Sequence, residues 1–155
     1  MISSCDIPLI TPDIVQRFIE ACNKMQGEVY YPVIEKKFND EKYPATRRTY
    51  FKLQDGTYTG GNMVVLNPEA IRKNWSLLEQ AIAARKSPLK LLSMIGFGFI
   101  IKYLFRRLTL EYTVRKVASI VGMSGSAVPV EDPEIGVDVD KESDYLLVKE
   151  ILERA

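Results

Sequence analysis

The sequence predicts a single α/β domain with a largely parallel sheet. Short β-branched and aromatic segments alternate with longer segments whose apolar residues recur at helical spacing. Such alternation is typical of folds in which helices cover a sheet. The chain has 155 residues, of which 46% are hydrophobic and 26% are charged, and this is enough for one ordinary hydrophobic core. We therefore expect residues 1–155 to form one domain.

The first expected elements are a strand and a capped helix. Residues 2–5 predict the end of a short strand. Thr11 suits the N-cap of a helix, and Pro12 suits its first position because an N–H has no partner there. Apolar residues then follow at helical spacing, and Gly27 is expected to end the helix.

A β-rich stretch and a charged stretch come next. Residues 28–34 predict a strand, in which Pro32 favours an edge position or a bulge. The charged residues 35–48 predict an exposed excursion. Residues 49–53 are expected to form a strand that ends at the turn signal of residues 55–56.

The rest of the chain continues the alternation. We expect, in order, a strand at 63–66, a broken helix from Asn67 to about residue 85, a helix at 88–107 weakened by Gly96 and Gly98, a helix from Thr109 to about Gly122, a strand at 127–130, a short strand end at 136–140 and a helix at 141–154. The apolar run at 91–101 is too short to span a membrane, so we expect a buried helix there.

Composition excludes several partner and reaction classes. A net charge of +1 gives no field that would attract nucleic acid or an acidic membrane. Cys5 and Cys22 form no disulfide framework and, without a signal peptide, predict reduced, buried thiols in the cytoplasm. The chain has no histidine, which excludes His-dependent nucleophilic, zinc and acid–base mechanisms. The remaining side chains suit phosphoryl or nucleotidyl transfer with a hard metal ion.

Carboxylates near the two ends of the chain are candidate metal ligands. Asp6 follows the first expected strand, and Asp138 and Asp140 lie in the last one. In open α/β sheets, ligands bind beyond the carboxyl ends of strands, and Mg²⁺ prefers oxygen ligands. Residues two apart share a face of a strand, so the last two carboxylates need a cation or donors nearby. The alternatives are that Asp6 only forms a turn and that Asp140 only caps the last helix.

A glycine pair and two cations are candidate substrate ligands. Gly60 and Gly61 allow close approach of backbone to a ligand, and Asn62 offers both a donor and an acceptor. A hairpin turn is the alternative. Arg48 and Lys86 lie near these motifs in the sequence and suit phosphate oxygens, although such cations also occur on solvated faces.

The order of these motifs resembles a known family. The stretches CDIPLITPDIV, ATRRTYFKLQDGTYTGGNMVVLNP, ARKSPLKLLSMIGFGFIIKYLFRRLTLE and EIGVDVDKESDYLLVKEIL cover nearly the whole chain. They resemble the MobA-like (molybdenum-cofactor guanylyltransferase-like) nucleotidyltransferases of the GT-A superfamily. The resemblance implies a Rossmann-like three-layer sandwich. The family's amino-terminal glycine-rich loop has no counterpart, so it also implies the carboxy-terminal part of such a domain, incomplete at the amino terminus.

The resemblance implies a Mg²⁺-dependent reaction. A nucleoside monophosphate would pass from a nucleoside triphosphate to a phosphorylated small molecule, and pyrophosphate would leave. Asp6 and either Asp138 or Asp140 would hold the metal ion and form the catalytic centre. The implied acceptor and phosphate ligands are Arg48, Gly60, Gly61, Asn62 and Lys86.

Two other functions remain open. The chain could be a non-catalytic binding or assembly module, which pairs as a homodimer through an exposed sheet edge. It could also be a GT-A glycosyltransferase that uses a sugar nucleotide with a similar carboxylate pair. Because the glycine-rich loop grips the triphosphate in the resembled family, we expect nucleotide transfer to need more than these residues.

Overall fold

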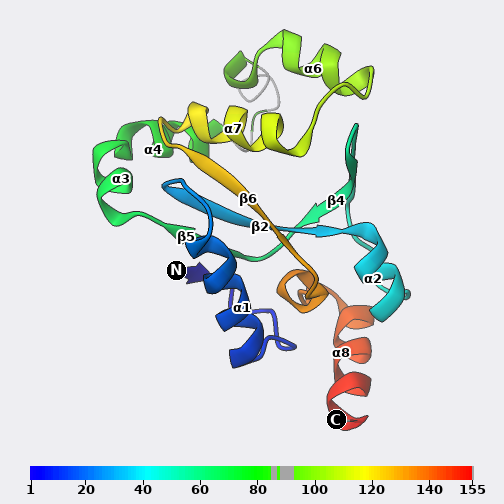
Figure 1. Ribbon diagram of the computed structural model, residues 1–155. Helices are drawn as coiled ribbons and strands as arrows, with labels where there is room; N and C mark the ends of the chain where they lie inside the picture. The colour runs from blue at the N-terminus through cyan, green and yellow to red at the C-terminus, as the bar shows by residue number, and fades with distance from the viewer. Residues whose placement is uncertain (85–86, 88–92, 155) are drawn as a thin grey trace.

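The sheet is centred on one strand, β2 (Val29–Glu35). The computed structural model describes residues 1–84, 87 and 93–154. Within these residues, six strands pair in the order β1-β5-β2-β4-β3, and β6 also pairs with β2. The other strands are β1 (Ile2–Ser3), β3 (Phe51–Leu53), β4 (Gly56–Gly60), β5 (Met63–Leu66) and β6 (Gly125–Val130). Partners therefore flank β2 on both sides (Figure 1).

The α/β class is confirmed, but the prediction of a largely parallel sheet is wrong. β2 and β6 run parallel, whereas the β1–β5, β2–β5, β2–β4 and β3–β4 pairs run antiparallel. The physical reason is the length of the connections. β3 and β4 pair across a two-residue link, which is far too short for the crossover of about a dozen residues that parallel partners need, and β4 and β5 then run on in one direction along the same side of β2. The expected hairpin turn is present, with residues 54–55 between the paired Leu53 and Gly56, and the strand at 63–66 is present as well.

Pro32 lies in the middle of this central strand, so the predicted edge position is wrong, whereas the predicted bulge agrees with the pairing, in which residues 31–32 lie opposite residues 61–64. On one side of β2, the partner changes at Pro32: Val29 and Tyr30 pair with β5, and the pairing with β4 begins at Val33. The Pro32 carbonyl accepts a hydrogen bond from Gly61 N at 3.0 Å on this side. Because N–H and C=O of a strand residue point the same way, the missing N–H of Pro32 faces the change of partner and removes no ladder bond.

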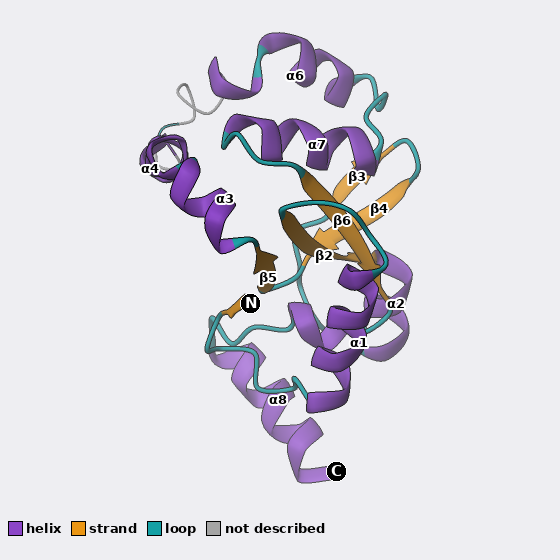
Figure 2. Cartoon of the chain, turned by 60° about the vertical axis from the view of Figure 1, so that its left-hand side comes forward, coloured by secondary structure: helices purple, strands orange, loops and turns teal. Residues whose placement is uncertain are grey.

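Helices lie on both sides of the sheet (Figures 1 and 2). They are α1 (Pro12–Asn23), α2 (Lys36–Lys42), α3 (Pro68–Lys73), α4 (Trp75–Ala84), α6 (Phe97–Leu104), α7 (Leu110–Ile120), the 3₁₀ helix η1 (Pro133–Gly136) and α8 (Glu142–Arg154). The predicted caps are confirmed at Thr11 and Thr109, whose side chains accept hydrogen bonds from the N–H groups of Ile14 and Tyr112. In the described residues, no helix is long and apolar enough to cross a membrane.

Four local predictions are wrong because tertiary packing decides them. Residues 36–42 form a helix that buries Asn39, instead of an exposed excursion. Residues 136–140 form no strand, because Gly136 ends η1 and the chain continues without ladder bonds. α6 is not buried, since 75% of Phe97 is exposed, and Cys5 is exposed while Cys22 is buried. The predicted helix start at Pro88 lies outside the described residues.

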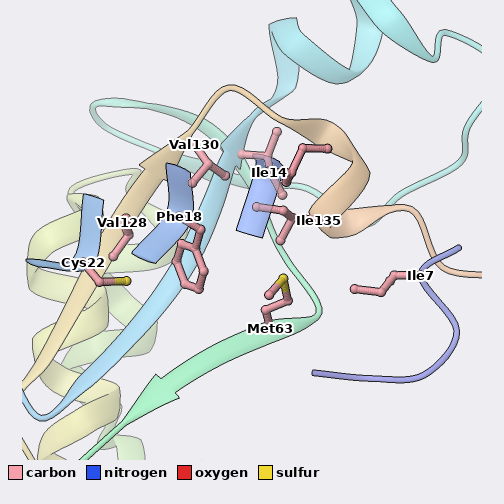
Figure 3. Packing of buried hydrophobic residues seen from close by; sticks show 9 residues of the cluster. Ile7, Ile14, Phe18, Cys22, Met63, Val128, Val130 and Ile135 are labelled. Carbon is pink, nitrogen blue, oxygen red and sulfur yellow. The ribbon is translucent and has the colours of Figure 1, made fainter. Parts of the chain in front are cut away.

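One apolar cluster packs the sheet against α1 and against the segments that carry Ile7 and Ile135. Phe18 of α1 is fully buried and shares this cluster with Ile34 of β2 and Val128 of β6. Figure 3 shows that the same cluster also collects Ile7 and Ile135, two residues outside the strands. Burial of these two side chains fixes the two connecting segments against the edge of the core.

The Glu28 carboxylate, directly before β2, predicts part of the loss of stability that acid causes. Glu28 Oε2 accepts hydrogen bonds from Ser124 N at 2.8 Å and Ser124 Oγ at 3.1 Å, and these bonds lower the pKa of Glu28 below its ordinary 4.5. A pKa that is lower in the folded than in the unfolded state stabilises the fold above pH 4.5 and loses this effect as pH falls through the folded value.

We therefore expect the free energy of unfolding in urea to fall more steeply below pH 4.5 for the wild type than for Glu28→Gln. Other carboxylates titrate equally in both proteins, so the difference between the two curves isolates Glu28. Parallel curves would contradict the expectation.

Candidate functional site

The Asp6 segment is tied to both the middle and the end of the chain. Ser4 N donates to the Asn62 carbonyl at 2.9 Å, and the Asp6 carbonyl accepts from Val139 N at 3.0 Å. Ile7, only 4% exposed, enters the main core cluster immediately after Asp6. Backbone bonds and one buried side chain thus place Asp6 beside the segment that carries Asp138 and Asp140.

Alternation places the two later carboxylates on one side of their segment, although it is not a strand. Val137 is buried and Val139 packs against the same small apolar cluster, beside Val148 of α8. Because side chains of an extended chain alternate, Asp138 and Asp140 point to the other side. Asp138 is half-buried and Asp140 is exposed.

The cap of α8 differs from the alternative considered for Asp140. The Asp144 carboxylate accepts hydrogen bonds from Asp140 N and Lys141 N, each at 3.2 Å. Asp144 reaches back to two N–H groups at the helix start, where a carboxylate also interacts favourably with the helix dipole. Asp140 contributes its backbone to this arrangement, and Asp144 provides the capping side chain.

Arg48 links the late carboxylates to the sheet. Its Nη1 donates to Asp138 Oδ1 at 3.1 Å, and its Nη2 donates to the Gly60 carbonyl at 3.3 Å. The Arg48 side chain is 12% exposed and that of Asp138 is 32% exposed, so water partly solvates this ion pair. Arg48 Nε is buried and has no hydrogen-bond partner among the described residues. The guanidinium therefore keeps one donor for another acceptor.

Gly60 ends β4, and Gly61 and Asn62 link it to β5; we call residues 60–62 the β4–β5 crossing. Gly61 N donates to the Pro32 carbonyl at 3.0 Å, and Asn62 N donates to the Ile135 carbonyl at 2.8 Å. Asn62 Nδ2 also donates to the Gly136 carbonyl at 3.4 Å. A Cβ atom on Gly61 would lie 2.5 Å from Ile135 Cγ2, so this position has no room for a side chain. The hairpin turn lies earlier, at residues 54–55, and not at the glycine pair.

The structure thus brings most of the candidate residues into one region. Hydrogen bonds connect, directly or through neighbours, Asp6, Arg48, Gly60, Gly61, Asn62 and Asp138. Asp140 lies next to them and is exposed. Lys86 lies outside the described residues.

A small polar cleft adjoins the Arg48–Asp138 pair. Its volume is about 80 Å³, and its lining includes Arg47, Arg48, Asp138, Asp140, Lys141 and Asp144. Sequence reasoning missed Lys141 and Asp144 as site residues, although their place one and four positions after Asp140 was a usable signal. The mixture of cations and carboxylates suits a ligand that carries phosphate groups together with a divalent cation.

A buried polar contact behind this cleft was also missed. Tyr43 OH donates to Glu134 Oε1 at 2.7 Å, and Lys42 Nζ forms an ion pair with the same oxygen. Burial and the hydrogen bond to the carboxylate both raise the pKa of Tyr43 above its ordinary range. The contact joins the end of α2 to η1, the helix that leads into Asp138. The charged composition of residues 35–48 gave no signal of this burial.

Asp6 passes one test for a metal ligand. Asp6 Oδ1 is buried and has no hydrogen-bond partner among the described residues, which is costly for a carboxylate unless a cation or donor binds it. No group of three or more His, Cys, Asp or Glu side chains in the described ranges is arranged to hold a metal ion. Mg²⁺ often takes only one or two protein carboxylates and completes its shell with water and substrate phosphates. Asp6 thus supplies one unpartnered carboxylate oxygen of the kind that such a site takes.

Comparisons with known proteins relate the fold to one solved structure. No family model and no curated protein match the chain. The structure is similar to a hypothetical transferase from Thermus thermophilus, with a TM-score of 0.82 and 34% sequence identity. The match covers 90% of this chain and 59% of the other chain. The two chains therefore share a fold, and this chain spans somewhat more than half the length of the protein it resembles.

The crowding at Gly61 predicts a large effect of a small substitution. We expect Gly61→Ala to lower the free energy of unfolding by about 1–3 kcal/mol, because its Cβ would overlap Ile135 and Pro32. Gly98→Ala is the matched control, since no described atom lies within 4 Å of the Cβ position. Urea unfolding of both variants measures the difference, and equal stabilities would refute the tight crossing.

The Arg48 contacts predict a second effect on stability. Arg48→Met keeps the aliphatic stem but leaves Asp138 and the Gly60 carbonyl without their donor. We expect a loss of about 1–3 kcal/mol, towards the lower end because Asp138 is partly solvated. Arg47→Met, at the exposed neighbouring position, should change stability much less. Similar losses in both variants would show that Arg48 has no special structural role.

Proposed function

We propose that this chain provides the metal and acceptor side of a nucleotidyltransferase of the MobA-like, GT-A type. The observation that carries the proposal is the bond from Val139 N to the Asp6 carbonyl, which brings two distant carboxylate segments together. The unpartnered Asp6 Oδ1 beside this bond supports a cation site. The similarity to a hypothetical transferase supports the broader class of group transfer.

The proposed reaction is an in-line displacement. An oxygen of the acceptor phosphate attacks the α-phosphorus of a nucleoside triphosphate, forms the new P–O bond, and displaces pyrophosphate. Asp6 and Asp138 or Asp140 would hold Mg²⁺. The ion would supply charge neutralisation for the reacting phosphates.

The chain's own residues have separate tasks in this proposal. Arg48 binds a phosphate through guanidinium N–H groups that its present contacts leave unpaired, and the carbonyl of Gly60 orients the guanidinium. Gly61 and Asn62 keep the two carboxylate segments at a fixed separation. Lys86 is proposed as a second phosphate ligand. Pairing of two copies through the short edge strand β1 is proposed as the route to a homodimer.

A metal titration tests the carboxylate site without requiring turnover. We expect saturable binding of Mg²⁺ or Mn²⁺ by isothermal titration calorimetry, strengthened by a nucleoside triphosphate. Asp6→Asn and Asp138→Asn should each weaken metal binding by about tenfold or more, because a neutral amide attracts the cation far less than a carboxylate does.

Asp13→Asn is the matched control, since Asp13 is an exposed carboxylate in the first turn of α1. Equal binding by Asp6→Asn, Asp138→Asn and the control would exclude this metal site. Metal binding that is strengthened by sugar nucleotides but not by nucleoside triphosphates would favour the glycosyltransferase alternative.

A further inference from the structure

A large apolar cavity lies on the face of the sheet opposite α1. Its volume is about 730 Å³, within the usual range for small-molecule sites of about 300–1,000 Å³. Residues of β2 and β4 form its floor, and residues of α4, α6 and α7 form its walls. Figure 1 shows α6 and α7 on the side of the sheet away from α1. None of the described residues that line it carries a charged side chain.

The floor follows from the alternation of β2. Val29, Tyr31 and Val33 point into the cavity, while Tyr30 and Ile34 pack against the core on the other face. Because β2 pairs with strands on both sides, its backbone donors and acceptors are largely used by the sheet. The floor therefore offers a ligand apolar surface and few hydrogen bonds.

Among the described residues that line the cavity, two of the five hydroxyl side chains already donate hydrogen bonds. Tyr58 OH donates to the Asp55 carbonyl at 2.9 Å, and Thr113 Oγ1 donates to the Thr109 carbonyl at 2.8 Å. The hydroxyls of Tyr31, Thr59 and Tyr103 are the polar side-chain groups that remain for a ligand, so a ligand with many polar groups would lose more hydrogen bonds to water than it gains. A hydrocarbon chain pays no such penalty and gains from leaving water.

α6 supplies a positively charged, apolar margin next to the cavity. Phe99 lines the cavity and stacks on Tyr112 at 6.2 Å, and Lys102 Nζ lies 4.4 Å from the centroid of the Tyr112 ring. Arg106 and Arg107 follow α6, and residues 93–110 contain no Asp or Glu; the carboxylate of Asp55 lies at the end of this segment, where it accepts hydrogen bonds from Leu110 N. Phe97, Leu104 and Phe105 are exposed on the same segment, between 72% and 75%.

We propose that this cavity binds the hydrocarbon chain of a single-chain anionic lipid, such as a fatty acid or an isoprenoid phosphate. The chain occupies the space between β2 and α7, and the anionic head group pairs with Lys102, Arg106 and Arg107. Charge complementarity at the margin and the absence of ionic groups among the described lining residues select this class of ligand. The site is separate from the Asp6 region, and the inference does not rest on the proposed nucleotidyl transfer.

Fluorescence titration with cis-parinaric acid, a fluorescent fatty acid, tests the cavity. We expect saturable binding of one molecule per chain. Val33→Phe and Val114→Phe place a ring in the cavity and should each raise Kd by about tenfold or more. Val64→Phe is the matched control, because Val64 lies on the partly exposed strand β5 and does not line the cavity.

Circular dichroism and thermal unfolding identify the variants that retain the fold, and either folded cavity variant is sufficient for the decision. Unchanged affinity in a folded Val33→Phe or Val114→Phe overturns the proposal. Absence of saturable binding by the wild type overturns it as well.

A second experiment tests the head-group assignment. The triple variant Lys102→Glu, Arg106→Glu, Arg107→Glu should raise the Kd of parinarate by about tenfold. The Kd of dodecanol, an uncharged chain, obtained by competition with the probe, should stay nearly unchanged. Arg115→Glu is the control, since Arg115 is exposed on α7 and pairs with Glu111. An equal effect of the triple variant on both ligands contradicts the proposed orientation.

Two other occupants of this face give different results. Sedimentation with phosphatidylglycerol vesicles that is unaffected by Val33→Phe, without binding of free parinarate, would indicate adsorption to a bilayer and overturn the cavity site. A second copy of the chain would make parinarate affinity fall as protein concentration rises, together with dimer formation in light scattering, and would also overturn it. Concentration-independent binding by a monomer supports the lipid site.

Discussion

The arrangement of the candidate site depends on the backbone of one residue, Asn62. Its carbonyl accepts from Ser4, its N–H donates to Ile135, and its side chain donates to the Gly136 carbonyl. Buried backbone groups need partners, so these bonds restrict where the first and last segments of the site can lie. Met63, the next residue, enters the core beside Ile135 (Figure 3). Polar pairing and apolar burial at this crossing therefore enforce the same geometry.

The same crossing separates two different chemical environments. β4 ends at Gly60, whose carbonyl accepts from Arg48 on the polar side and whose Cα lies against the Tyr31 ring at the cavity. Burial raises the pKa of Tyr31, while the nearby Arg48 acts in the opposite direction. One strand end is thus close to a charged cleft and to an apolar cavity. A sheet can divide such environments because alternate side chains face opposite sides.

Local signals explain which parts of the fold could be predicted. Thr11 and Thr109 were identified as caps because a hydroxyl directly before a helical run can accept a hydrogen bond from an N–H group in the first turn of that helix. β5 was identified from four consecutive apolar residues. The direction of strand pairing and the burial of Asn39 depend on distant segments, which periodicity does not encode. The candidate site was located from motif order, but the Tyr43–Glu134 contact behind it joins residues 91 positions apart and had no local signature.

The ion pair between Arg48 and Asp138 explains how one region could serve both a cation and a phosphate. Without a metal ion, the guanidinium supplies the positive charge that Asp138 needs in a half-buried position. A divalent cation at the same carboxylate would replace that charge and weaken the pair by repulsion. Arg48 would still be held by the Gly60 carbonyl, and its Nε has no hydrogen-bond partner among the described residues. Metal binding and phosphate binding would then reinforce each other, because the first frees the group that performs the second.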